Sequence, residues 1–272
     1  MCLITFAWQP GTPTPLRLMG NRDELHARPT APLGYWQENT AIAGGRDLEA
    51  GGSWLAAKRG GVVAVLTNVR DPQLLTPPSA PSRGELVANA LQCKDIEGWL
   101  TALNQGDALS YAGFNLLVAT PHQLWHLHRS RERLTLCKVP PGVHGLSNAD
   151  LNSPWPKLLH VRNALEHSLS KQGALNEAPL PAWPSAVQRA MQNPQEASVK
   201  ELPDTGVGIE LERQLSAAFI IGERYGTRAT SWLTLDHQGH IEITEQRFGA
   251  QGRFQGETTL RLFNGSNDSS DS

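Results

Sequence analysis

The sequence has no excess of charge of one sign and no long apolar run. Its 272 residues carry 24 Lys and Arg against 26 Asp and Glu, a formal net charge of -2. A chain with this balance has no electrostatic basis for binding nucleic acid. No apolar run approaches the roughly 20 residues that span a bilayer as a helix, and the start lacks the basic and apolar segments of a secretory signal. We therefore expect neither a nucleic-acid partner nor a membrane-spanning segment.

Cysteine is scarce, with Cys2, Cys93 and Cys137 only. An odd number of widely separated cysteines without metal-ligand spacing fits a reducing compartment better than a disulfide framework, so we expect a cytoplasmic protein. His126 and His128, two apart on one face of an expected strand, could bind a metal ion. Because no third ligand follows at a known spacing, we expect no metal site and no required cofactor.

Short apolar segments separated by turn residues predict strands and hairpins along most of the chain. Helices are expected between these groups. The expected strands lie in 2–8, 16–20, 53–68, 114–139, 228–248 and 258–263, and the expected helices in 86–93, 96–105, 155–172 and 185–192. Ser82 with Glu85 forms a capping-box pattern before the first helix, and Asp95 can cap the second. Residues 193–210 read as a loop, 1–263 as a single domain, and the polar 264–272 as a disordered tail.

This order of elements predicts an α+β protein. Tight turns between most strands favour antiparallel pairing. The strands "GVVAVLT" and "FNLLVAT" are apolar on both faces, so each needs cover on both sides. Two mainly antiparallel sheets packed together, with helices outside, would provide that cover.

The chain begins "MCLITFAW", with Cys2 directly before an expected strand. If Met1 stays, Cys2 is an ordinary small residue near a chain end. If Met1 is removed, Cys2 carries a thiol and a free α-amine on one carbon, which is a nucleophile with its own base attached.

The string Asn21-Arg22-Asp23-Glu24 follows the second strand. That strand is the hairpin partner of the first, so the string lies near Cys2, where an Asp could hold the α-ammonium. The alternative is a solvated turn with a surface ion pair. Strand alternation predicts that Asp23 faces the Cys2 amine, while Glu24 and Arg22 share the opposite face. Arg22 would then reach a ligand only if the chain bends after Asn21.

Further polar residues stand at strand ends. Asn68 and Asn148 could direct their amides at an oxyanion, although either could equally be a turn former. Arg228, at a strand start, could neutralise a carboxylate or be an edge charge without a role. His144, close to Asn148, is a candidate for ligand contact.

The strings "MCLITF", "GNRDELHARP", "GGSWLAAKRGGVVAVLTN", "RGELV", "PGVHGLSNADLNSPWPKL" and "YGTRATSWLTLD" together resemble the NRDE family, also called the transport-and-Golgi-organisation family. The resemblance runs from residue 1 to about residue 245. That family in turn resembles the N-terminal nucleophile hydrolases of the penicillin-acylase and bile-salt-hydrolase type. The resemblance implies a four-layer αββα sandwich.

The resemblance also implies roles for particular positions. The matched positions are Cys2 as nucleophile, Asp23 as the contact of the new amine, Asn68 and Asn148 as oxyanion-hole and "TNSP"-type residues, and Arg228 as the late Arg near the nucleophile. One position departs from the pattern. The acylases keep an Arg three residues before the Asp, whereas Arg22 directly precedes Asp23.

Two functions follow as hypotheses. The NRDE resemblance implies intracellular binding and mobilisation of an amphipathic anion around Cys2, haem first, with acyl-CoA or an acyl-lipid also possible. In that case Arg22 or Arg228 would form ion pairs with the carboxylates of the ligand. Apolar cover would come from Trp8, Trp36 or Trp54, and an axial ligand from His144, His26 or Cys2.

The alternative is an N-terminal-cysteine amidohydrolase. The Cys2 thiolate would attack an amide carbonyl, and its α-amine, with an ordinary pKa of about 7.7–8.0, would relay the proton. Asn68 and Asn148 would stabilise the oxyanion. We rank the carrier first because it rests on the closer family. The sequence does not indicate an oligomeric state.

Overall fold

The computed structural model describes residues 2–171 and 183–264. The strands are β1 (Cys2–Trp8), β2 (Leu16–Leu25), β3 (Thr30–Trp36), β4 (Asn39–Asp47), β5 (Leu55–Lys58), β6 (Val62–Asn68), β7 (Phe114–Ala119), β8 (Leu124–Arg129), β9 (Leu134–Lys138), β10 (Gly142–Leu146), β11 (Tyr225–Leu235), β12 (Ile241–Phe248) and β13 (Phe254–Leu262). The α-helices are α1 (Gly84–Gln92), α2 (Ile96–Asn104), α3 (Pro156–Lys171), α4 (Ser185–Met191) and α5 (Ile209–Gln214).

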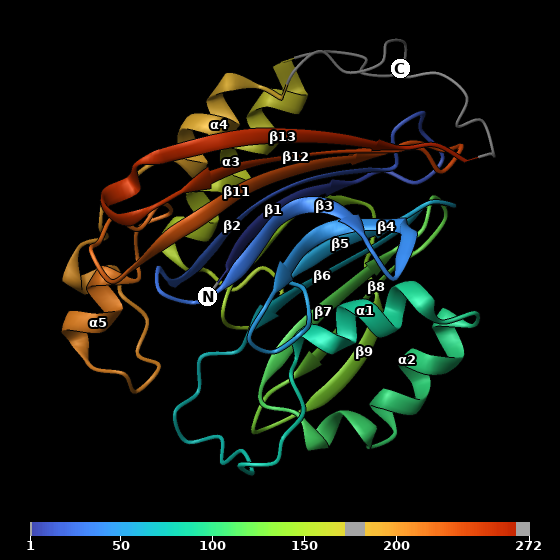
Figure 1. Ribbon diagram of the computed structural model, residues 1–272. Coiled ribbons are helices and arrows are strands. Elements are labelled where there is room, and N and C mark those ends of the chain that lie inside the picture. The colour runs from blue at the N-terminus through green and yellow to red at the C-terminus, as the bar shows by residue number, and fades with distance from the viewer. Residues whose placement is uncertain (1, 172–182, 265–272) are drawn as a thin grey trace.

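The strands form two sheets (Figure 1). The first has six strands in the order β10-β1-β2-β11-β12-β13, and the second has seven in the order β3-β4-β5-β6-β7-β8-β9. Every neighbouring pair is antiparallel. The second sheet follows chain order, and between β6 and β7 the chain leaves the sheet to form α1 and α2.

Alternation along β1 shows how the layers stack. Ile4 and Phe6 belong to the core between the two sheets, whereas Leu3 and Ala7 pack with side chains of α3 and α4 on the outer face of the first sheet. The helices α1 and α2 cover the outer face of the second sheet, and Figure 1 shows the two helix pairs on opposite sides of the molecule. The four-layer αββα sandwich is therefore confirmed. Among the described residues, no helix is long and apolar enough to cross a membrane.

Three strands were not predicted from the sequence, namely β3, β4 and β10. β3 and β4 contain several glycines and few β-branched residues, which lowers strand propensity. One of these glycines has a packing reason, because a Cβ on Gly44 would lie 2.5 Å from the Cβ of Ala56 on β5. β10 is only Gly142–Leu146, and it pairs with β1 at the edge of the first sheet.

β2 is longer than predicted, since it runs through the polar string to Leu25. The structure shows why polar residues can occupy a buried strand here. Asn21 donates to the carbonyls of Met191 at 2.8 Å and Ala218 at 2.7 Å, and accepts from the hydroxyl of Thr230 at 2.7 Å. A buried amide with these partners avoids most of the desolvation penalty.

Helix starts were predicted with mixed success. Asp95 caps α2, because its Oδ1 accepts from the Gly98 N–H at 2.9 Å. The Ser82–Glu85 capping box was wrong, since α1 has no side-chain cap. The carboxylate of Glu85 instead accepts from the Tyr111 hydroxyl at 2.6 Å. The expected stop at Gly173 and the expected disorder of 265–272 lie outside the described residues.

Replacing Asp95 by Ala should lower the free energy of unfolding by about 1 kcal/mol, because the Gly98 N–H loses its acceptor. Ser82→Ala is the matched control and should change it by less than about 0.5 kcal/mol, as expected for a residue that caps nothing. Denaturant unfolding of both variants measures the difference. Equal losses would show that the Ser82 cap forms in solution.

Candidate functional site

A cavity of about 620 Å³ lies between the two sheets at the end where β1 begins. The first sheet contributes Cys2, the 22–24 string, Arg228 and part of β12, and the second contributes residues of β3, β4 and β6. The segment 76–84 closes another side. The cavity therefore draws on strand ends from widely separated parts of the chain.

Cys2 lies on the cavity wall opposite Arg22, its Cα partner in the β1–β2 ladder. Opposite residues in an antiparallel pair point to the same face, so both side chains face the cavity. The Cys2 carbonyl accepts from the Ser147 hydroxyl at 3.2 Å. Burial raises the pKa of the Cys2 thiol to about 11; the negative charge of Asp23 acts in the same direction and the positive charge of Arg22 opposes it.

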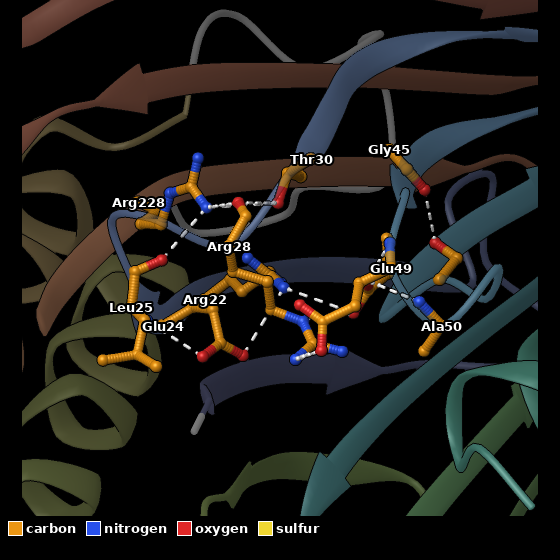
Figure 2. A network of polar contacts seen from close by, with 11 residues as sticks. Arg22, Glu24, Leu25, Arg28, Thr30, Gly45, Glu49, Ala50 and Arg228 are labelled. Carbon is orange, nitrogen blue, oxygen red and sulfur yellow. Dashed lines mark hydrogen bonds and ion pairs between the residues drawn. The ribbon is translucent and has the colours of Figure 1, made fainter.

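Arg22 is the central cation of the wall. Its Nη2 lies 3.6 Å from Glu24 Oε2 and 3.9 Å from Asp47 Oδ2, as Figure 2 shows for Arg22 and Glu24. The residue is only 8% exposed, and its Nη1 is buried without a hydrogen-bond partner among the described residues. A buried donor in this state favours a ligand that accepts hydrogen bonds.

Asp23 points to the other face of β2. Its Oδ1 accepts from the Thr227 hydroxyl at 2.7 Å, and the residue is fully buried. On that side Lys157 donates to the Leu215 carbonyl at 2.7 Å. Burial lowers the pKa of Lys157 to about 8, and the charge of Asp23 opposes this shift.

The predicted alternation is thus present, but the cavity lies on the face of Arg22 and Glu24 rather than on that of Asp23. The contact of Asp23 with the Cys2 amine stays a prediction. The Cys2 side chain shares its face with Arg22 and Glu24, and the side chain of Asp23 lies on the opposite one. No bend after Asn21 is needed to bring Arg22 to the cavity, because β2 stays paired with β1 in regular register through Arg22. The alternation of side chains along a strand predicts which residues share a face. Packing against the second sheet determines which of the two faces becomes the cavity wall.

Asn68 ends β6 on the cavity wall and is half-buried. Asn148 is buried behind it and does not line the cavity. The Asn148 Nδ2 donates to the Asn68 carbonyl at 3.0 Å, and its Oδ1 accepts from the Ser147 hydroxyl at 3.3 Å. Asn148 therefore connects the end of β10 to the end of β6, while its part in an oxyanion hole stays a prediction.

Arg228 also lines the cavity. It is the extra residue of an irregularity in the β2–β11 ladder between Thr227 and Ala229. Its Nη1 donates to the carbonyls of Leu25 and Arg28 and to the Thr30 hydroxyl, as Figure 2 shows. Burial, followed by the charge of Arg22, lowers the pKa of the guanidinium. Arg228 thereby fastens the turn that leads from β2 into β3.

Of the four predicted ligand-binding residues, Arg22 and Trp54 line the cavity, whereas Trp8 and His144 do not. Trp8 is buried in the core at the far end of β1. His144 has both ring nitrogens engaged, Nε2 with the Pro140 carbonyl at 2.9 Å and Nδ1 with the Asn152 amide at 3.0 Å. These two assignments are corrected, because core packing and hydrogen bonds already occupy both side chains.

Two other suggested contacts also lie elsewhere. Trp36 packs between the second sheet and its helices, where its Nε1–H donates to the Gly44 carbonyl at 3.2 Å. His26 lies in the turn after β2 and does not line the cavity. Among the residues suggested as axial ligands, only Cys2 lines the cavity.

Sequence reasoning missed most of the positive charge. The lining residues include six arginines, namely Arg22, Arg28, Arg46, Arg83, Arg228 and Arg247, against the acids Glu24, Asp47 and Glu245. Asp23 also lines the cavity, but its carboxylate points to the other face of β2. Arg83 begins the string "RGELV", so its position was marked, although its charge was not used. It donates to the Gly113 carbonyl at 3.0 Å, and burial lowers its pKa.

A second polar cluster lies away from the cavity. Ligand atoms of His126, His128 and Asp150 all lie within 4.8 Å of one another. Burial lowers the pKa of His126 to about 3 and that of His128 to about 4. The third donor comes from the loop after β10, so sequence spacing could not have supplied it.

A family model described as Transport and Golgi organisation 2 matches residues 1–250. The chain belongs to this family. The chain is 32% identical to the Transport and Golgi organization protein 2 homolog of Homo sapiens, over 90% of this chain and 92% of that protein. It is 29% identical to the homolog of Bos taurus, over 97% of this chain and 99% of that protein. These matches confirm the resemblance carried by the sequence motifs.

Among solved structures, the chain is similar to the mutant C2A conjugated bile acid hydrolase from Clostridium perfringens. The TM-score is 0.45 and the identity 10%, over 95% of this chain and 92% of that chain.

Alkylation of Cys2 in the chain that keeps Met1 should accelerate steadily from about pH 7 to about pH 10.5, because the thiolate reacts and the thiol pKa is about 11. A small alkylating reagent and peptide mass spectrometry measure the rate at Cys2 alone. A plateau below about pH 9 would show a thiol that burial does not perturb.

Proposed function

We propose that this protein binds and carries a small amphipathic anion in the cavity around Cys2, with haem as the first candidate ligand and acyl-CoA or an acyl-lipid as the next. The observation that carries this proposal is the Arg22 guanidinium, buried on the wall with Nη1 unpartnered among the described residues. Pairing with a carboxylate or phosphate would satisfy this donor through a charge-assisted hydrogen bond.

The size and lining of the cavity support such a ligand. Its volume of about 620 Å³ falls within the range of roughly 300–1,000 Å³ typical of small-molecule sites. Trp54, Leu66 and Phe248 supply apolar surface, while the arginines outnumber the acids on the same wall. A ligand with one apolar face and one anionic edge complements both features.

Haem, as the carried ligand, has both an apolar ring and anionic carboxylates. Its carboxylates would pair with Arg22, its ring would lie on Trp54, and Cys2 would be the axial ligand among the three residues suggested from the sequence. A buried thiol with a raised pKa must lose its proton to bind iron, which weakens binding near neutral pH. Weak coordination suits a carrier that must release its ligand. We also keep the cytoplasm as the proposed location, since the thiols of Cys2, Cys93 and Cys137 are free.

Arg22→Gln should weaken haem binding about tenfold or more. A hydrogen bond to a charged group contributes about 1.5–3 kcal/mol, and about 1.4 kcal/mol corresponds to a factor of ten. Titration with haem, followed by absorbance, measures the affinity, and competition with an acyl-CoA compares the two ligand classes. Thermal melting of the variant checks that the fold is retained.

Arg261→Gln is the matched control. Arg261 lies on β13 of the same sheet, pairs with Glu242 and has a side chain 64% exposed, so haem binding should be unchanged. If Arg22→Gln and Arg261→Gln both bind haem saturably with the affinity of the parent protein, the ligand does not contact Arg22. No saturable binding of either ligand by the parent protein would overturn the carrier function.

The second candidate is an N-terminal-cysteine amidohydrolase. The observation that favours it is that Cys2 and Asn68 both line the cavity. Asp23 follows Arg22 in the chain, and Arg22 is the Cα partner of Cys2 in the β1–β2 ladder. Its condition is the loss of Met1, because only then does Cys2 carry a free amine.

Intact mass of protein from a native host should show a chain starting at Cys2 if this mechanism operates, since small second residues permit removal of Met1. Turnover of an amide panel should then be lost in Cys2→Ala. A mass that includes Met1 excludes the self-base mechanism while leaving the carrier function testable by haem titration.

A further inference from the structure

We propose that Asn115, His126, His128 and Asp150 form a binding site for a divalent transition metal, with Zn²⁺ as the expected ion. None of these residues lines the cavity around Cys2, so the proposal is independent of the function proposed above. The donors come from β7, β8 and the loop after β10. A bound ion would join the second sheet to the loop that carries Asn148.

The distances between the donor atoms carry the proposal. His126 Nε2 and His128 Nδ1 lie 3.0 Å and 2.7 Å from Asn115 Oδ1, and His128 Nδ1 lies 3.8 Å from Asp150 Oδ1. In a tetrahedral site with metal–ligand distances of about 2.0–2.1 Å, neighbouring ligand atoms stand about 3.3 Å apart. These three distances lie on both sides of that value, and the ligand atoms of His126, His128 and Asp150 all lie within 4.8 Å of one another. The donor atoms would draw together to surround one ion.

The donors are oriented by further hydrogen bonds. Asn115 Nδ2 donates to Thr67 Oγ1 at 3.0 Å and to the Ala149 carbonyl at 2.8 Å, which leaves Oδ1 directed between the two imidazoles. Asp150 Oδ1 accepts from the Leu151 N–H at 2.8 Å, and Arg133 donates to Asp150 Oδ2. Such supporting contacts are typical around metal ligands.

Burial also suits a metal site. Asn115, His126 and His128 are 0%, 2% and 3% exposed, whereas the Asp150 side chain is 34% exposed and gives the ion a route from solvent. Two imidazole nitrogens with two oxygens form a donor set that Zn²⁺ accepts. Without an ion, the His126 and His128 N–H groups donate to Asn115 Oδ1. On binding, each proton moves to the other ring nitrogen and the freed lone pair faces the metal.

The test is calorimetric titration of chelator-treated, full-length protein with Zn²⁺, with metal content measured after dialysis. One equivalent should bind and raise the melting temperature, as mass action requires for a ligand of the folded state. Asp150→Asn should lower the affinity at least tenfold, and His128→Gln should abolish binding. Asp150 is partly exposed, so its variant keeps the test decisive if His128→Gln does not fold.

Two controls separate this site from other zinc ligands. His122→Gln changes an exposed histidine in the turn between β7 and β8 and should bind one equivalent with parental affinity. Cys137→Ser removes the thiol opposite His126 in the β8–β9 ladder and should do the same. The proposal is overturned if the parent binds no Zn²⁺, if Asp150→Asn binds as tightly as the parent, or if Cys137→Ser abolishes binding.

Discussion

The pairing of β1 with β2 is the constraint on which the candidate site depends. Its register sets Cys2 opposite Arg22, and the alternation of side chains then distributes every neighbour between two faces. Cys2 and Arg22 face the second sheet and the cavity, while Asp23 faces the helices. A slip of one residue would exchange these faces. It would bury the guanidinium of Arg22 under α3 and expose the carboxylate of Asp23 to the arginine-lined wall. The apolar residues of β1 prevent such a slip, because Ile4 and Phe6 must lie between the sheets and Leu3 under the helices.

The polar string on β2 is stable as a strand because each face provides different partners. On the helix side, Asn21 and Asp23 find hydroxyls of β11 and backbone carbonyls. On the cavity side, Arg22 Nη2 lies 3.6 Å and 3.9 Å from the carboxylates of Glu24 and Asp47, and its Nη1 has no hydrogen-bond partner in the part of the chain that the structure describes. The helix-side amide of Asn21 is thus satisfied within the protein, whereas Arg22 on the cavity side keeps a donor without a partner among the described residues. The irregularity at Arg228 serves the same site, since an extra residue redirects a side chain locally. Arg228 can then fasten the turn from β2 to β3 without displacing Arg22.

The sequence correctly predicted those features that depend on the pattern of residues close together in the chain. Strands rich in β-branched residues, the cap at Asp95 and the proximity of Cys2 to the 21–24 string all followed from spacing and hairpin logic. The prediction from sequence was wrong for features that depend on contacts between residues far apart in the chain. The glycine-rich β3 and β4 become strands because the second sheet needs them and because Gly44 permits close approach to Ala56. Parity correctly separated Asp23 from its neighbours, but no local signal shows which face meets the second sheet. His144 was chosen for its nearness to Asn148 in sequence, whereas its ring is held by Pro140 and Asn152.

The two candidate functions differ in the electrostatics of a single residue. With Met1 attached, Cys2 is a buried thiol whose neutral form is favoured, because burial outweighs the attraction of Arg22. A neutral, apolar thiol beside Trp54 belongs to a binding wall. Without Met1, the α-ammonium would stand on the same carbon as the thiol, and a positive charge at that distance favours the thiolate. The amine, once deprotonated, could accept the proton that the thiol must lose. The same cavity would then hold an activated nucleophile beside Asn68. The state of the N-terminus, rather than any rearrangement of the sheets, therefore determines whether Cys2 carries the free amine that amide cleavage would require.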